Sequence, residues 1–144
     1  MTRAAAGLTL LACAALVLAG CGGLSHGAFV KHADAVCAAY ASGASTLPKP
    51  SRYAQVAAYV DRNLPLYEAA LQKLEALKPP AQDKAAVAQW LAADRRVASA
   101  LHALGQAALR NNLPAVQTAA EEVRAAGLAS SEAADTIGLT VCGR

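Results

Sequence analysis

The sequence has little of what most catalytic and cofactor chemistry needs. Aromatic residues make up 4% of its 144 residues, with one Trp and one Phe. It contains no Gly-x-Ser-x-Gly, no dinucleotide or phosphate loop and no Cys-x-x-Cys-His, the motifs of serine hydrolases, nucleotide binding and covalent haem attachment. We therefore expect a protein that is not an enzyme and that holds no cofactor.

The charged residues are few and balanced. Thirteen Lys and Arg residues stand against ten Asp and Glu residues, for a formal net charge of +3. No block of like charge occurs, which argues against a nucleic-acid partner and against a polybasic lipid-binding segment. His26, His32 and His102 are not spaced at i, i+4 from one another, so no metal site is predicted.

The first part of the chain has the composition of a secretory signal. An apolar run from Ala4 to Leu18 follows one positive charge at Arg3 and leads into small residues. A helix of about 15 residues is roughly 22 Å long, whereas the hydrocarbon core of a bilayer is about 30 Å thick. We therefore expect a cleaved signal peptide over residues 1–20. An uncleaved anchor is the alternative, because the glycines after the run extend it to Leu24.

The apolar run ends at Leu18-Ala19-Gly20-Cys21, and these four residues resemble the lipobox of bacterial lipoproteins. The resemblance implies that Cys21 becomes the mature N-terminus, with a diacylglycerol on its thiol and an acyl chain on its amine. Two or more acyl chains give stable anchoring. The membrane would then be a partner through the lipid anchor, on the extracytoplasmic face of the bacterial cell membrane. A plain secretory signal with an incidental Cys is the alternative.

The cysteine count depends on this segmentation. Of the four cysteines, Cys13 leaves with the signal and Cys21 is the lipidation site, so Cys37 and Cys142 remain. In an oxidising compartment this pair is expected to form a disulfide. A closed loop of about 106 residues is worth roughly 4.7 kcal/mol in the chain-entropy model. A reactive or metal-binding pair is the alternative, although neither Cys has a second ligand at close spacing.

The mature chain is predicted to be a short tether followed by one all-α domain. Residues 21–27 are interpreted as a lipidated flexible tether, and residues 28–144 as the helical bundle domain. Apolar residues at helical spacing predict four helices. In chain order, these helices are expected over about 28–44, from a cap at Ser51 to the Lys78-Pro79-Pro80 breaker, over about 81–110, and from a cap at Asn112 to Gly138.

Short connections between the helices favour an up-down four-helix bundle. In such a bundle the chain ends lie at the same end, so a tail after the fourth helix can reach Cys37. Pro65 interrupts the second helix and must either kink it or restart it with Asn63 as a new cap. We favour the kink, because the apolar stripe keeps its phase through Pro65.

The remaining aromatic residues give the only candidates for a ligand site. Tyr40 and Tyr67 fall on the apolar stripes and are expected in the core. Tyr59 lies off the main stripe of the second helix, and with Trp90 it is a candidate to line a small-ligand pocket. Arg95-Arg96, which follow Asp94, are interpreted as a solvated helix face with local ion pairing, and an anion site is the alternative.

Three short segments carry a wider resemblance: Ala-Asp-Ala-Val-Cys at 33–37, Leu-Lys-Pro-Pro at 77–80 and Ile-Gly-Leu-Thr-Val-Cys-Gly at 137–143. The chain resembles short uncharacterised actinobacterial helical lipoproteins and secreted proteins. This resemblance implies a helical domain with a Cys37–Cys142 bridge, and it implies no activity. Ala57-Ala58-Tyr59-Val60 and the flanking cysteines also resemble small secreted helical haem carriers of mycobacteria, but the His-Pro that follows the Tyr in those proteins is missing.

These observations together predict a lipid-anchored, non-enzymatic binding or interaction module of the cell envelope. Its partner would be an envelope protein or a ligand that the sequence does not identify. The alternative is a carrier of a small ligand, such as haem or a lipid.

Overall fold

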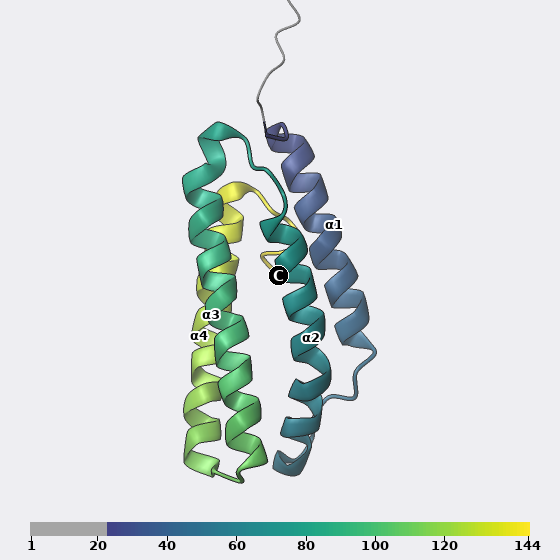
Figure 1. Ribbon diagram of the computed structural model, residues 1–144, viewed down its shortest axis with the longest axis vertical. Coiled ribbons are helices and arrows are strands. Elements are labelled where there is room, and N and C mark those ends of the chain that lie inside the picture. Colours follow the sequence, from purple (N-terminus) through teal and green to yellow (C-terminus); the bar gives the residue numbers. More distant parts are fainter. Residues whose placement is uncertain (1–22) are drawn as a thin grey trace, which may run out of the picture.

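The computed structural model describes residues 23–144 (Figure 1). The predicted signal segment, Cys13 and the candidate lipidation residue Cys21 lie outside the described residues. The predictions for these residues therefore remain predictions.

The described part of the chain is built from four long α-helices. They are α1 (His26–Ser45), α2 (Val56–Glu75), α3 (Lys84–Leu109) and α4 (Leu113–Ile137). Two 3₁₀ turns, η1 (Tyr53–Gln55) and η2 (Ala81–Asp83), precede α2 and α3. No strand occurs between residues 23 and 144, and the predicted all-α class is confirmed.

Helix α1 begins two residues earlier than predicted. The Ser25 hydroxyl oxygen accepts a hydrogen bond from the Ala28 N–H at 3.3 Å and caps the helix. Just before this cap, the Leu24 N–H donates to the carbonyl of Lys78 at 2.8 Å. The last residues of the predicted tether are therefore part of the folded domain.

Helix α2 differs from its prediction at its start. Ser51 does not cap it, because η1 intervenes and the α-helix begins at Val56. The Gln55 side-chain oxygen accepts instead from the N–H groups of Ser51 at 2.9 Å and Arg52 at 3.2 Å. The helix then continues through Pro65, so a restart capped by Asn63 is wrong.

Helix α4 has the two ends that the sequence predicts. The Asn112 side chain accepts a hydrogen bond from the Ala115 N–H at 3.2 Å and caps the first turn. At the other end Gly138 has a φ of 83°, the left-handed conformation that favours glycine, and it terminates the helix.

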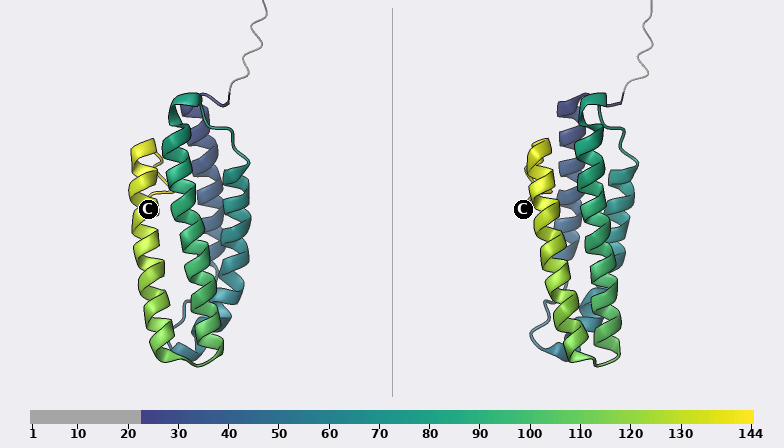
Figure 2. Two further views of the ribbon diagram at one scale, coloured as in Figure 1. Left: turned by 60° about the vertical axis from the view of Figure 1, so that its left-hand side comes forward. Right: turned by 90° about the vertical axis from the view of Figure 1, so that its left-hand side faces the viewer.

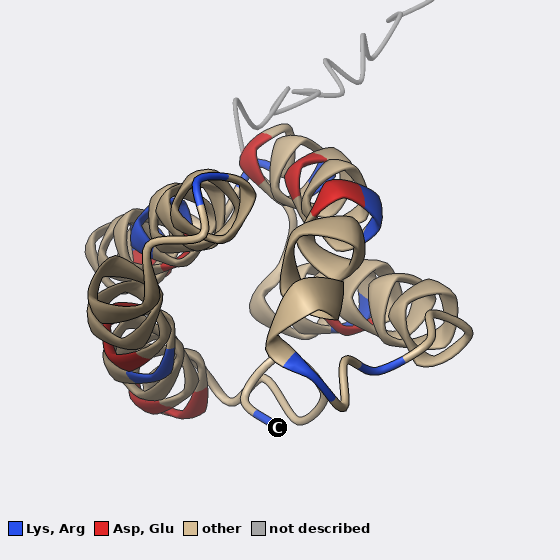
Figure 3. Cartoon of the chain, turned by 90° about the horizontal axis from the view of Figure 1, so that it is seen from below, with Lys and Arg blue, Asp and Glu red and all other residues tan. Residues whose placement is uncertain are grey.

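Each helix packs against the next one in the chain (Figures 1 and 2). The contact between α3 and α4 is the most extensive, whereas α1 has few close backbone contacts with α4. Seen end-on, charged residues of both signs are distributed over the helices (Figure 3). Because α1 and α4 are packed little against each other, other residues must fill the space between them.

The hydrophobic core consists of two clusters of buried side chains. The larger one combines residues of all four helices and the C-terminal tail, and the smaller one lies between α3 and α4. The members of the larger cluster are Phe29, Ala33, Leu74, Val87, Trp90, Ala134, Ile137 and Leu139. The members of the smaller cluster are Ala107, Ala108 and Val116.

The C-terminal tail, residues 139–144, closes the side between α1 and α4. Leu139 is 2% exposed and belongs to the larger core cluster. The predicted disulfide between Cys37 and Cys142 is present, with the two Cα atoms 5.2 Å apart. The disulfide therefore joins the middle of α1 to the tail that follows α4.

Asp34 of α1 holds the same tail through hydrogen bonds. Its Oδ2 accepts from the Thr140 N–H at 3.0 Å and hydroxyl at 2.8 Å, and its Oδ1 accepts from the N–H groups of Val141 at 2.9 Å and Cys142 at 3.3 Å. Burial alone would raise the pKa of Asp34, but these hydrogen bonds to its charged form outweigh burial and lower that pKa. The ionised carboxylate is therefore the form that secures the tail.

Replacing Asp34→Asn is expected to destabilise the fold, because the amide offers one acceptor oxygen and turns an NH₂ group toward N–H donors. Hydrogen bonds to charged groups are worth about 1.5–3 kcal/mol, and partial exposure reduces this, so we expect a loss of about 1–2 kcal/mol at pH 7. A depressed pKa gives stability that is present above the unfolded value of about 3.9 and is lost as the pH falls through the folded value. Urea unfolding at pH 7 and pH 3 checks both points.

Asp61→Asn, at an exposed position of α2, serves as the control for Asp34→Asn and should change stability little at either pH. If the destabilisation by Asp34→Asn were the same at pH 3 and pH 7, the charge of Asp34 would not be what holds the tail.

Two helix-interior glycines provide a matched test of helix packing. A Cβ atom at Gly105 of α3 would lie 2.9 Å from Cγ1 of Val60, whose side chain is 3% exposed and β-branched. A Cβ atom at Gly127 of α4 would meet nothing within 4 Å. Gly105 therefore allows the close approach of α3 to α2, whereas Gly127 has no such role.

We expect Gly105→Ala to destabilise the protein by about 1 kcal/mol, because overpacking costs about 1–3 kcal/mol and the better helix propensity of Ala returns about 1. Gly127→Ala gains the better helix propensity of Ala without overpacking, so it should stabilise the protein by up to roughly 1 kcal/mol. Urea unfolding of both variants measures the difference. A shift of the same sign in both would contradict the packing explanation for Gly105.

Candidate functional site

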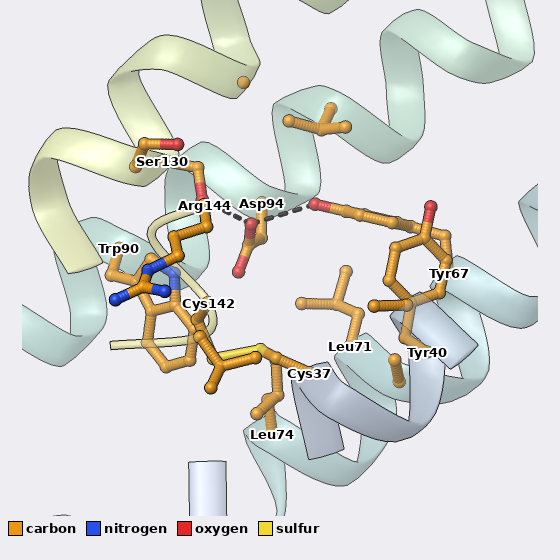
Figure 4. A pocket seen from close by; sticks show the side chains of 16 residues that line it. Cys37, Tyr40, Tyr67, Leu71, Leu74, Trp90, Asp94, Ser130, Cys142 and Arg144 are labelled. Atoms are coloured by element: carbon orange, nitrogen blue, oxygen red, sulfur yellow. Dashed lines mark hydrogen bonds between the residues drawn. A yellow bond between two sulfur atoms is a disulfide. The ribbon is translucent and has the colours of Figure 1, made fainter. Parts of the chain in front are cut away.

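A cavity of about 230 Å³ lies between the helices and the C-terminal tail. All four helices contribute to its wall, and the disulfide and the tail close one side (Figure 4). Its principal lining side chains are Tyr40, Tyr67, Leu71, Leu74, Trp90, Asp94, Val97, Ser130, Val141 and Arg144. The lining thus combines aromatic and aliphatic groups with a small number of polar ones, which is the usual composition of small-molecule sites.

Asp94 is the buried charged residue of this wall, with 7% of its surface exposed. Its Oδ1 accepts two hydrogen bonds, from the Ser130 hydroxyl at 2.6 Å and from the Tyr67 hydroxyl at 2.9 Å. Figure 4 shows both bonds meeting at the same carboxyl oxygen, with the second oxygen turned away from them toward the cavity. α2, α3 and α4 are therefore joined through one carboxyl group that keeps an oxygen free for the cavity.

The environment of Asp94 disfavours its charge. Burial raises the pKa of Asp94, and the hydrogen bonds from Ser130 and Tyr67 offset only part of that rise. The pKa of Tyr67 is also raised, first by burial and then by the neighbouring Asp94 charge and hydrogen bond. The other charged or titratable lining residues are Tyr40 of α1 and Arg144 of the tail, and none comes from α4.

Trp90, one turn before Asp94 on α3, provides a second unusual polar group. Its side chain is 1% exposed, and its indole nitrogen is buried without a hydrogen-bond partner among the described residues. A buried donor without a partner costs about 1–3 kcal/mol. Trp90 therefore contributes a buried N–H without a partner in the described part of the chain to the same helix face that carries Asp94.

Tyr40 and Tyr67 form an aromatic pair on the side of the cavity formed by α1 and α2. Their ring centroids are 5.3 Å apart, and the ring planes meet at 84° in an edge-to-face arrangement. The Tyr40 hydroxyl donates to Oδ1 of the buried Asn63 at 3.1 Å. Both rings lie on the inner faces of their helices, but they are half-buried at the cavity and belong to neither core cluster, so the predicted core placement is met only in part.

The two predicted ligand residues are not brought together. Trp90 lines the cavity around Asp94, but Tyr59 lines a separate cavity of about 130 Å³ with Leu47 and Pro48. The next residue, Val60, faces α3, and one residue of helix corresponds to a turn of about 100°. Tyr59 is therefore directed toward the connection between α1 and α2, and the prediction of one pocket beside Tyr59 and Trp90 is wrong.

Asp94 was not predicted as a site residue, although a signal for it exists in the sequence. It lies four residues after Trp90 and three before Val97, which places it on the inner stripe of α3. The adjacent charges favoured a solvated face instead. Arg95 does not pair with Asp94: its Nε donates to Oε1 of Glu75 at 2.7 Å.

Residues 23–144 carry neither a candidate metal site nor a candidate membrane-spanning helix. No group of three or more His, Cys, Asp or Glu side chains in this part could hold a metal ion. His26 Nδ1 lies 2.7 Å from Oδ2 of Asp83. None of the described helices combines the length and the apolar character needed to cross a bilayer.

Comparison with known proteins gives no match. No protein-family model matches the chain, and no curated protein or solved structure is significantly similar to it.

Asp94→Asn is expected to stabilise the protein at neutral pH, because the amide oxygen can still accept from Ser130 and Tyr67 without a buried charge. A group whose pKa is raised on folding contributes stability below its unfolded pKa of about 3.9, and that stability is lost as the pH rises through the folded pKa. Each unit of difference corresponds to roughly 1.4 kcal/mol. The melting temperature of Asp94→Asn should exceed that of the native chain, and the difference should increase from pH 4 to pH 8.

Ser130→Ala is the companion variant to Asp94→Asn, because it removes a hydrogen bond that favours the charged form of Asp94. It should lower the melting temperature more at pH 8 than at pH 4. If the difference in melting temperature between Asp94→Asn and the native chain decreased as the pH rose, Asp94 would not be a buried ionisable carboxyl group.

Proposed function

We propose that this chain is a lipid-anchored extracytoplasmic binding module that holds a small molecule in the cavity around Asp94. One observation carries the binding role: a carboxyl group that is 7% exposed turns one oxygen into a cavity of about 230 Å³. A buried charge without a full set of partners is costly. Such residues are typical of functional sites, and a bound ligand would replace solvent at the carboxyl oxygen that contacts neither Ser130 nor Tyr67.

The proposed scaffold is an up-down four-helix bundle. Consecutive helices are neighbours, and in Figure 1 α1 and α3 run in one direction while α2 and α4 run in the other. In bundles of this kind, ligand sites are built in the core from side chains on facing helices. Tyr67, Asp94 and Ser130 come from three different helices, which supports this interpretation.

The proposed anchor is the lipidated Cys21, as the lipobox implies. The structure supports a position of the domain close to the membrane, because Leu24 is hydrogen-bonded to the Lys78 carbonyl and a Cβ at Gly23 would overlap the carbonyl oxygen of Pro79. Three residue steps from Cys21 to Leu24 span roughly 10 Å. The end of the bundle that contains the α2–α3 connection would therefore lie next to the lipid surface.

We propose binding and not catalysis, because the side chains that line the cavity do not form the group that nucleophilic catalysis needs. The Ser130 hydroxyl donates directly to Asp94, and no His lies in the wall to link a Ser and an Asp as in a hydrolase triad. The cavity also favours a ligand smaller than haem, since its volume is below the roughly 300–1,000 Å³ of pockets for drug-sized ligands.

The anchor is tested by Cys21→Ala, with Cys13→Ala as the matched control. The native chain and Cys13→Ala should fractionate with membranes at high salt and be released by detergent, whereas Cys21→Ala should appear in the soluble extracytoplasmic fraction. Intact mass would show diacylglycerol on the first two and not on the third. If the native chain stayed in the membrane at high salt while its intact mass showed the uncut signal segment and no diacylglycerol, an uncleaved anchor would be indicated and lipidation contradicted.

A further inference from the structure

We propose that the cavity around Asp94 binds a small organic cation, a primary amine attached to a compact apolar group. This inference rests on the proposed function, since it names the class of ligand for the same cavity. It follows from the donors and acceptors of the wall, its aromatic rings and its volume.

The Asp94 carboxyl group favours a cation. Oδ1 of Asp94 is already occupied by the Ser130 and Tyr67 hydroxyls, and the second oxygen faces the cavity. An ionised carboxylate only accepts hydrogen bonds, whereas an ammonium group only donates them. A hydrogen bond between ionised partners is about twice as strong as one between neutral groups. An ammonium group therefore matches the free oxygen and also compensates the buried charge.

The aromatic side chains favour the same ligand. Trp90, Tyr40 and Tyr67 all line the cavity, and the phenol hydroxyl of Tyr67 lies 2.9 Å from the Asp94 carboxyl. A cation within about 6 Å of an aromatic ring is attracted by the ring quadrupole, by about 2 kcal/mol or more where water is excluded. A carboxylate with three aromatic residues in one cavity is thus suited to an amine and not to an anion.

The size of the cavity limits the apolar part of the ligand. An apolar cavity of about 150 Å³ can hold one benzene molecule, and this cavity measures about 230 Å³. It therefore has room for a single ring or a short branched chain in addition to the ammonium group. The aliphatic residues Leu71, Leu74 and Val97 line it as well and provide the apolar surface.

Arg144 is the cationic residue of the lining, but it does not act as the cation that pairs with Asp94. Its side chain is exposed, and no ion pair joins it to Asp94. Solvent and salt screen a charge in such a position. It should weaken the binding of a cation only slightly, and Arg144→Gln should strengthen that binding at low salt.

The chain contains its own probe, because Trp90 is its single Trp and lies in the cavity wall. We would titrate the exported Cys21→Ala chain with benzylamine, benzyl alcohol and benzoate at pH 7.5, excite Trp90 selectively, and verify each affinity by calorimetry. These probes share one ring and differ in charge. We expect benzylamine to bind at least tenfold more tightly than either of the other two.

Three variants serve as controls. Asp94→Asn should weaken the binding of benzylamine at least tenfold and leave the binding of benzyl alcohol nearly unchanged. Glu68→Gln, at an exposed position of α2, should change the affinity for neither probe. Gly127→Leu fills the cavity from α4, where a Cβ meets no atom within 4 Å, so it should abolish the binding of all three probes. Circular dichroism would verify that each variant is folded.

The outcomes separate the two proposals. If benzyl alcohol bound as tightly as benzylamine and Gly127→Leu abolished both, the cavity would be a binding site but the preference for a cation would be overturned. Tightest binding of benzoate, lost in Arg144→Gln, would overturn it as well. If no probe bound at millimolar concentration, both the cation proposal and the proposed small-molecule role of the cavity would be wrong.

Discussion

The hydrogen bonds that the Asp34 carboxylate accepts from residues 140–142 hold the first helix to the tail that follows the last one. Much of the structure depends on this contact, because α1 has few close backbone contacts with α4 and packs mainly on α2. The disulfide makes the same connection covalently one helical turn further along α1. With the tail in place, Leu139 enters the core beside Phe29 and Ile137. The Asp34 hydrogen bonds, the disulfide and the larger core cluster therefore form one unit that holds the tail to α1.

The three segments on which the resemblance to actinobacterial lipoproteins depends converge on this unit. Segment 33–37 contributes the carboxylate and one Cys, and segment 137–143 contributes the N–H donors and the other Cys. In segment 77–80, Leu77 packs against the same core cluster and Lys78 accepts the hydrogen bond from Leu24. Asp94 and its hydrogen-bond partners Tyr67 and Ser130 lie outside these segments. The segments contribute to the cavity only through Cys37, Val141 and Cys142, which close one side of its wall.

The sequence predicted local features better than contacts between helices. Helical periodicity, the cap at Asn112 and the left-handed Gly138 depend on neighbouring residues, and each is present. The disulfide could be predicted because only two cysteines remained for pairing. The cavity could not, because Asp94 meets Tyr67 and Ser130 across 27 and 36 residues, and those contacts depend on how far each helix is shifted along its neighbour. The charged run around Asp94 also concealed its inward position, and Tyr59 was misplaced because periodicity does not say which neighbour a half-buried side chain meets.

The disulfide has a consequence for the time and place at which the cavity becomes complete. Cys37, Val141 and Cys142 are themselves part of its wall, so thiol oxidation links two sides of the cavity in the same event that ties the tail to α1. In a reducing compartment, the Asp34 hydrogen bonds and the buried Leu139 would be left to hold that wall in place. Under the proposed export, the cavity would therefore have its covalently closed wall only in the compartment where thiols are oxidised.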